Sequence, residues 1–194
     1  MLGGTFDPIH LGHVAVARAA LDCVPLDEVL LVPAALPPHR RAAVAAAEDR
    51  LAMCRLAVQG EPRISVSDIE LRRSTPSFTV HTLEQLAAER PSDELYLVLG
   101  WDAAREIRSW REPDRVLERA TLVVVSRPGL SAPTRRDLEA AGIKPEGTVL
   151  CDVATPPVQA TAIRDRVAAG ASLEGLLTPA VAEYVRSHGL YSRA

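Results

Sequence analysis

The residues best suited to chemistry stand near the start of the chain, within residues 3–13. Gly3 and Gly4 let the backbone approach a ligand closely and expose N–H groups to it, and the helix expected just downstream adds positive potential. Both effects favour an anion, and phosphate is the natural candidate. His10 and His13, spaced i, i+3, would share one face of the helix start and could both donate hydrogen bonds to one phosphate.

The histidine pair has two other interpretations. At this spacing the side chains could hold a metal ion, or they could simply be solvated at a helix start. A zinc site has little support, because the acidic neighbour and third ligand of the common zinc patterns are missing around His10 and His13. We therefore expect no protein-bound metal.

Composition bounds the class of protein. The chain has 194 residues, of which 47% are hydrophobic and 24% charged, which predicts a single compact domain rather than a disordered chain. A net charge of -3 argues against a nucleic acid polymer as partner but leaves small anionic ligands open. The start resembles no signal peptide, and no stretch approaches the ~18 apolar residues of a membrane span. We expect a cytoplasmic protein without a membrane partner.

The three cysteines, Cys23, Cys54 and Cys151, are odd in number, far apart and without a Cys-x-x-Cys pair. This spacing predicts neither a disulfide framework nor a zinc site.

Apolar runs rich in Val, Leu and Ile alternate with helical patterns, which predicts an α/β fold with a doubly wound parallel sheet. The expected strands are 28–33, 63–69, 94–100, 121–126 and 148–151. The expected helices are 12–22, 48–59, 79–90, 103–109, 113–119, 134–141, 161–169 and 179–188. One domain would cover residues 1–194, with 156–194 as a C-terminal helical part.

Ligands of such a sheet lie beyond the carboxyl ends of the strands, and several polar or aromatic residues follow predicted strands. Gly100 and Asp102 could meet a ribose, although Asp102 could equally cap the next helix. Arg127 could face a phosphate or be a solvated charge. Trp110 has an aromatic face suited to stacking on a ligand ring, whereas Trp101 could equally fill the core. The connection 34–47 is long enough to be functional or disordered.

Residues 3–13 resemble the His-x-Gly-His motif of the nucleotidyltransferase superfamily, and the whole chain resembles the bacterial nicotinate-nucleotide adenylyltransferase family. Further segments carry this resemblance nearly end to end. They are Ser77 to Leu83, Gly100-Trp101-Asp102 with Trp110, Ser126 to Gly129, and the tail from Thr178 to Tyr191. The resemblance implies a Rossmann-like fold and adenylyl transfer from ATP to nicotinic acid mononucleotide, giving deamido-NAD and pyrophosphate.

The resemblance also implies roles for individual residues. His10 and His13 would be catalytic, and Mg²⁺ would arrive bound to ATP. ATP would be bound by Gly4, Thr5, Phe6, Gly100, Asp102, Arg127, Thr161, Ile163 and Arg164. The mononucleotide would be bound by His39, Arg40, Thr79 and Trp110.

The chain departs from the family pattern in three places. Gln159 and Ala160 stand where two serines are expected, and Arg40 stands where many relatives have Lys. Only Met1 and Leu2 precede the glycines, too few for a central strand, so we expect a gap in the sheet and a native chain that begins upstream with a few apolar residues.

Two other functions fit the opening motif. One is a related adenylyl- or cytidylyltransferase, such as a pantetheine-phosphate adenylyltransferase, which would lack the Thr79 segment and the closing tail. The other is a non-catalytic nucleotide-binding module, which the altered residues Gln159 and Ala160 keep open. The sequence does not indicate an oligomeric state.

Overall fold

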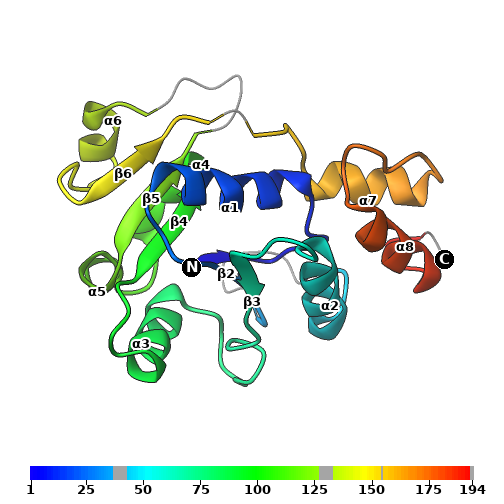
Figure 1. Cartoon of the computed structure of the whole chain (residues 1–194), viewed down its shortest axis with the longest axis horizontal. Helices are drawn as coiled ribbons and strands as arrows, with labels where there is room; N and C mark the ends of the chain where they lie inside the picture. The colour runs from blue at the N-terminus through cyan, green and yellow to red at the C-terminus, as the bar shows by residue number, and fades with distance from the viewer. Residues whose placement is uncertain (37–42, 127–132, 154, 193–194) are drawn as a thin grey trace.

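The computed structural model describes residues 1–36, 43–126, 133–153 and 155–192 (Figure 1). The strands are β1 (Leu2–Gly4), β2 (Val29–Pro33), β3 (Ile64–Val66), β4 (Tyr96–Gly100), β5 (Thr121–Val125) and β6 (Thr148–Cys151). The helices are α1 (Leu11–Cys23), α2 (Ala47–Ala57), α3 (Thr79–Glu89), α4 (Trp101–Ala104), α5 (Pro113–Arg119), α6 (Arg135–Ala140), α7 (Ala160–Ala168) and α8 (Pro179–Ser187), with the 3-10 helix η1 (Ile107–Ser109). Each helix in the described ranges is too short or too polar to traverse a bilayer.

The strands are parallel and follow the spatial order β3-β2-β1-β4-β5-β6. Ladder hydrogen bonds join β1, β2 and β3 into one set and β4, β5 and β6 into another. Met1 joins the two sets, because its carbonyl accepts from the Val98 N–H at 2.9 Å and its amino group donates to the Tyr96 carbonyl at 2.7 Å. The order reverses between β1 and β4, the place where doubly wound sheets bind ligands. The predicted doubly wound parallel sheet is confirmed.

Both faces of this sheet are covered by helices. Along β5, Val123 and Val125 pack in one apolar cluster with α1 and α2, whereas Leu122 and Val124 pack in another with α3 and α5. Successive side chains of a strand point to opposite faces, so a strand buried on both sides must be apolar throughout. This is why the strands appear in the sequence as unbroken apolar runs.

Two predicted elements differ from the observed ones by more than two residues at an end. The predicted strand 63–69 ends at Val66, because the chain then turns and the Ile69 N–H donates to the Ser67 hydroxyl at 3.2 Å. The predicted helix 103–109 is divided into α4, which begins at Trp101 directly after β4, and η1. The remaining predicted boundaries agree with the structure within two residues.

The expected gap at the first strand is wrong. The glycines themselves belong to the strand, so that Leu2, Gly3 and Gly4 pair with residues 31–33 of β2. On the other side Met1 supplies the hydrogen bonds to β4 described above. The central position is thus occupied by a strand of three residues, shorter than its neighbours.

The amino group of Met1 gives the fold a pH-dependent stability. Burial lowers the pKa of this group to about 5, with the Glu28 carboxylate acting weakly in the opposite direction. Between pH 8 and pH 5 the unfolded chain binds a proton that the folded chain does not. We therefore expect the free energy of unfolding to fall as the pH drops through this window, by on the order of a few kcal/mol.

Urea unfolding at pH 8, 6.5 and 5 measures this term. A chain with four added N-terminal residues, Val or Ile in type, serves as comparison, because its amino group lies elsewhere. We expect the added residues to reduce the pH dependence of the free energy of unfolding. If the free energy of unfolding depends on pH equally in the two chains, the assignment of this dependence to Met1 is contradicted.

The prediction about the cysteines is wrong for one pair. Cys23, the last residue of α1, forms a disulfide with Cys151, the last residue of β6, with a Cα–Cα distance of 6.0 Å across 128 residues. Sequence spacing could not reveal this pair, because it arises only where α1 crosses the face of the sheet (Figure 1). Cys54 is a buried free thiol whose pKa burial raises.

Candidate active site

The turn between β1 and α1 forms the centre of the candidate site. Phe6 has a left-handed backbone, with φ of 50°, and its ring is buried. The chain then passes through the cis peptide bond between Asp7 and Pro8 and reaches His10, the N-cap residue of α1. The first backbone N–H groups of α1 therefore lie beside the two histidines, as the sequence predicts for an anion site.

The imidazoles of His10 and His13 stack on each other, with ring centroids 3.6 Å apart and planes at 22°. The backbone N–H of His10 donates to Nδ1 of His13 at 3.2 Å. This hydrogen bond requires Nδ1 of His13 to be unprotonated, so a neutral His13 carries its proton on Nε2. His13 is thereby prepared to donate a hydrogen bond from Nε2 to a ligand.

Small residues allow this packing. The Phe6 ring edge meets His13, with centroids 4.9 Å apart. A Cβ added at Gly4 would come within 2.9 Å of the Phe6 ring, and one at Gly12 within 3.0 Å of Nδ1 of His10. Both glycines are therefore needed for the close approach of the rings, whereas a Cβ at Gly3 would meet its nearest atom at an ordinary 3.9 Å.

We expect Gly4→Ala to lower the stability of the fold by about 1–3 kcal/mol, since the buried Phe6 ring must shift to make room. The shift would also displace His13 from its contact with Phe6. Gly3→Ala is the matched control, one residue away in the same strand, and should unfold within a few degrees of the unaltered protein. Thermal unfolding of both variants measures the difference. Equal melting temperatures would show that the Phe6 ring can shift without a loss of stability.

The second predicted phosphate motif lies against this turn. Arg164 donates from Nη1 to the carbonyl of Asp7 at 2.7 Å and from Nη2 to the Thr161 hydroxyl at 3.1 Å. Thr161 itself is exposed in the first turn of α7. The fold thus brings together the two segments that the sequence assigned to ATP, although 157 residues separate Asp7 from Arg164.

Two residues assigned to ATP have buried side chains. Phe6 and Ile163 both lie in the apolar core between the sheet and the helices. A ligand could reach only their backbone groups. Their side chains instead fix the phosphate turn and the start of α7 to the core.

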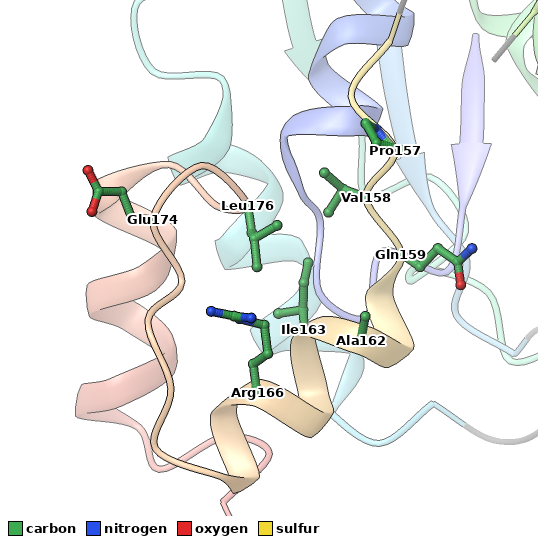
Figure 2. A pocket seen from close by; sticks show the side chains of 8 residues that line it. All are labelled: Pro157, Val158, Gln159, Ala162, Ile163, Arg166, Glu174 and Leu176. Carbon is green, nitrogen blue, oxygen red and sulfur yellow. The ribbon is translucent and has the colours of Figure 1, made fainter. Parts of the chain in front are cut away.

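Gln159 is the N-cap residue of α7 and makes no capping hydrogen bond with its side chain. It lines a pocket of about 340 Å³ between the start of α7 and the loop before α8 (Figure 2). The pocket is lined by Pro157, Val158, Gln159, Ala162, Ile163, Arg166, Glu174 and Leu176. Neither histidine borders it, so this hollow lies beside the predicted chemistry rather than at it.

We expect the double change Gln159→Ser and Ala160→Ser to stabilise the protein by about 1 kcal/mol, because a serine hydroxyl at the N-cap accepts from the first turn of the helix. The KM for ATP should fall or stay unchanged. Ala162→Ser adds a hydroxyl to the same helix without capping it and serves as control. A large loss of activity in the double variant would mean that the Gln159 side chain has a role of its own.

Two of the four residues predicted to bind the mononucleotide, Thr79 and Trp110, belong to segments that meet at the start of α3. Thr79 is the first residue of α3, and Phe78 before it has the Arg111 guanidinium over its ring at 5.1 Å. Arg111 directly follows Trp110, so this contact brings the Trp110 segment to the Thr79 segment. The Ser77 hydroxyl accepts hydrogen bonds from the backbone N–H groups of residues 35 and 36. The beginning of the connection that follows β2 therefore lies in the same region.

The remaining predicted residues divide into two groups. Gly100 ends β4 and is the N-cap residue of α4, so Asp102 lies in the first turn and is not the helix cap that the sequence allowed. His39, Arg40 and Arg127 lie outside the described residues. Within those residues, no cluster of three or more His, Cys, Asp or Glu side chains is placed to hold a metal ion.

Two supporting residues were missed by the sequence analysis. Asp7 lies within residues 3–13 and had no predicted role, yet its carboxylate is buried and accepts several hydrogen bonds. Arg50 of α2 is 1% exposed and donates to the backbone carbonyls of Thr5 and Ala34, each at 2.7 Å. A charged residue in a predicted helix gives no signal that it will be buried, so only the fold reveals Arg50.

The parallel sheet, with the two predicted phosphate segments at its point of reversal, agrees with the fold of a nucleotidyltransferase. The family model described as Cytidylyltransferase-like matches residues 1–166. The chain belongs to this family and is an enzyme of nucleotidyl transfer.

Individual relatives narrow the assignment. The chain is 44% identical over 191 residues to a protein of Thermus thermophilus named "Probable nicotinate-nucleotide adenylyltransferase", covering 98% of this chain and 97% of that one. A protein of the same name from Pseudomonas syringae is 42% identical over 204 residues, covering 98% and 92%. Within the family, the chain belongs to the nicotinate-nucleotide adenylyltransferases.

A solved structure agrees with this fold. Plasmodium falciparum nicotinic acid mononucleotide adenylyltransferase in complex with NaAD matches 98% of this chain and 95% of its own, with a TM-score of 0.78 at 18% identity.

Proposed function

We propose that this enzyme transfers the adenylyl group of ATP to nicotinic acid mononucleotide. The 5′-phosphate oxygen of the mononucleotide forms a bond to the α-phosphorus of ATP, and the bond from that phosphorus to the bridging oxygen of pyrophosphate breaks. The products are deamido-NAD and pyrophosphate. The observation that carries the proposal is the hydrogen bond from Arg164 to Asp7, which joins both phosphate segments around the start of α1.

The protein's contribution is to position two phosphates and to stabilise charge. His13 would donate from Nε2 to the transferred phosphate, because its Nδ1 is occupied by the His10 backbone N–H. His10, Thr161 and Arg164 would hold the remaining oxygens, assisted by the positive end of α1, whose Leu11 N–H itself donates to the Leu176 carbonyl at 2.9 Å. The reaction needs no covalent intermediate with the enzyme.

Mg²⁺ would arrive as part of the substrate, bridging phosphate oxygens of ATP and neutralising charge on the leaving pyrophosphate. The donor set fits this arrangement, because both carboxylate oxygens of Asp7 already accept hydrogen bonds from protein groups. Residues at the phosphate turn would then bind the triphosphate rather than the ion. We place the reaction in the cytoplasm, where ATP is available.

The mononucleotide would lie at the start of α3, where the contact between Arg111 and Phe78 brings the Trp110 segment to the Thr79 segment. Trp110 is half-buried and could present its ring face to the pyridine. His39 and Arg40 would bind the carboxylate, the group that distinguishes the acid from the amide electrostatically. We therefore expect a preference for the acid form.

Pyrophosphate release tests the proposal. The protein is incubated with Mg²⁺ and ATP together with nicotinate mononucleotide, nicotinamide mononucleotide or phosphopantetheine in turn. Release with the first alone, or at least tenfold faster, supports the proposal. Release with phosphopantetheine alone favours the related transferase, and none with any acceptor favours a binding module.

The same assay tests the role of Trp110. Trp110→Ala should raise the KM for the mononucleotide more than the KM for ATP. Trp101→Ala is the control, because Trp101 packs against the same apolar cluster at the start of α4.

A further inference from the structure

The carboxylate of Asp7 is the meeting point of three segments. Asp7 is 6% exposed. Its Oδ2 accepts from the Val44 N–H at 2.7 Å, and its Oδ1 accepts from the Ala45 N–H at 3.1 Å and from the Tyr191 hydroxyl at 2.8 Å. Val44 and Ala45 lead into α2, whereas Tyr191 lies beyond α8, so this one side chain ties the phosphate turn to both.

The Tyr191 hydroxyl is held firmly in its place. Tyr191 is 8% exposed and has a φ of 63°, and the turn before it is closed by the hydrogen bond from the Leu190 N–H to the Val185 carbonyl. Burial raises the pKa of Tyr191 further above its ordinary value, and the hydrogen bond to Asp7 acts in the same direction. The hydroxyl therefore keeps its proton and remains a donor to Asp7.

The backbone of Asp7 has a separate partner. Its carbonyl accepts from Arg164, which the proposed function places at the ATP phosphates. Asp7 also lies three residues before His10. The turn that ends at the histidines is thus held both by the contacts of the Asp7 carboxylate and by its carbonyl, so loss of a carboxylate contact would allow the backbone of the turn, and with it the carbonyl that orients Arg164, to shift.

Electrostatics gives the hydroxyl a second effect. A carboxylate beside a triphosphate site repels the incoming anion, and hydrogen-bond donors to the carboxylate offset part of this repulsion. Removal of one donor from a buried carboxylate leaves a lone pair unsatisfied, and the group then turns toward other donors. Arg164 and Arg50 are cationic donors that already contact backbone carbonyls of this turn, those of Asp7 and Thr5.

We propose that Tyr191 is a positioning residue for adenylyl transfer, its hydroxyl acting through the Asp7 carboxylate to hold the phosphate turn and Arg164 in their reactive geometry. The inference rests on the proposed function. It assigns to the C-terminal tail a part in the reaction although the tail touches no reacting atom.

The test is Tyr191→Phe, which removes one oxygen and keeps the ring. We expect kcat to fall about tenfold and the Kd for ATP to rise severalfold at 25 °C, while thermal unfolding shows the variant fully folded. Tyr184→Phe is the matched control. Tyr184 lies in α8 and donates to Asp49 of α2 at 2.9 Å, so this change removes a tail hydroxyl that does not reach the phosphate turn. It should stay within twofold of the unaltered protein.

A double variant separates positioning from simple stabilisation. If Tyr191 acts through Asp7, then Tyr191→Phe added to Asp7→Asn should lower kcat by less than twofold beyond Asp7→Asn alone. If Asp7→Asn does not fold, the test is the Kd for ATP, which should rise in Tyr191→Phe and stay within twofold in Tyr184→Phe. Unchanged kcat and Kd in Tyr191→Phe, or an equal loss in Tyr184→Phe, would overturn the proposal.

The proposed function is judged independently by the unaltered protein. The proposed function fails if the unaltered protein forms no deamido-NAD from ATP and nicotinate mononucleotide. The Tyr191 inference is read from the ratio between variant and unaltered protein in ATP binding, which requires no particular acceptor.

Discussion

His13→Ala is expected to lower kcat by ~10²-fold or more while the protein stays folded, the loss typical of removing one donor to a transition state. In a neutral His13 the ring proton is on Nε2, because Nδ1 accepts from the His10 backbone N–H. His13 is only half-buried, so the loss of its ring should cost little stability. Steady-state pyrophosphate release and thermal unfolding, measured on one preparation, separate the two effects.

Two conservative variants sharpen this prediction. Gln places an amide nitrogen near the position of Nε2, whereas Asn retains an acceptor near Nδ1 but no donor further out. We therefore expect His13→Gln to retain more activity than His13→Asn. His188→Ala, at the exposed end of α8, controls for loss of a stacked imidazole, since His188 stacks on Tyr184 at 3.8 Å. Near-normal turnover of folded His13→Ala would rule out the donor role.

Arg50→Met is expected to lower the free energy of unfolding by about 3–5 kcal/mol. The methionine fills most of the volume but leaves the carbonyls of Thr5, Ala34 and Ala45 without the guanidinium donors that they have now. The loss should also reduce activity, because Thr5 belongs to the phosphate turn. Burial lowers the pKa of Arg50, with the nearby Asp7 acting to raise it, which shows how far this charge is removed from water.

Urea unfolding at pH 7.5 measures the effect. Arg55→Ala is the matched control on the same helix, because Arg55 is exposed, and its change should lie within about 0.5 kcal/mol. Arg50→Lys keeps the charge but cannot reach several carbonyls at once, so it should fall between the two. Stability of Arg50→Met equal to that of Arg55→Ala would contradict the role given to Arg50.

Most of the fold could be predicted from the sequence because its signals are local. The apolar run at Thr121–Val125 must be buried on both faces, and Pro113 sits at the first position of α5, where proline suits a helix start. The first strand was underestimated for a local reason too. Glycines have low strand propensity, so Gly3 and Gly4 were counted with the turn although they belong to the ladder.

The candidate site was predictable in part. The spacing of His10 and His13 and the resemblance around Thr161 and Arg164 predict phosphate sites at the starts of two helices. In the structure these two segments meet at Asp7, and their binding of phosphate stays a prediction. The roles of Asp7, Arg50 and Tyr191 escaped the sequence, since each depends on partners far along the chain.

By itself, then, the sequence determined the order of strands and helices, the histidine motif and the kind of ligand that this motif favours. Each of these follows from periodicity, turn chemistry and residue type within about ten residues. Only the tertiary structure decided that Cys23 meets Cys151 and that Tyr191 reaches Asp7 across 184 residues. Such contacts depend on which elements the sheet topology brings side by side. A local sequence pattern does not indicate which distant residues will meet.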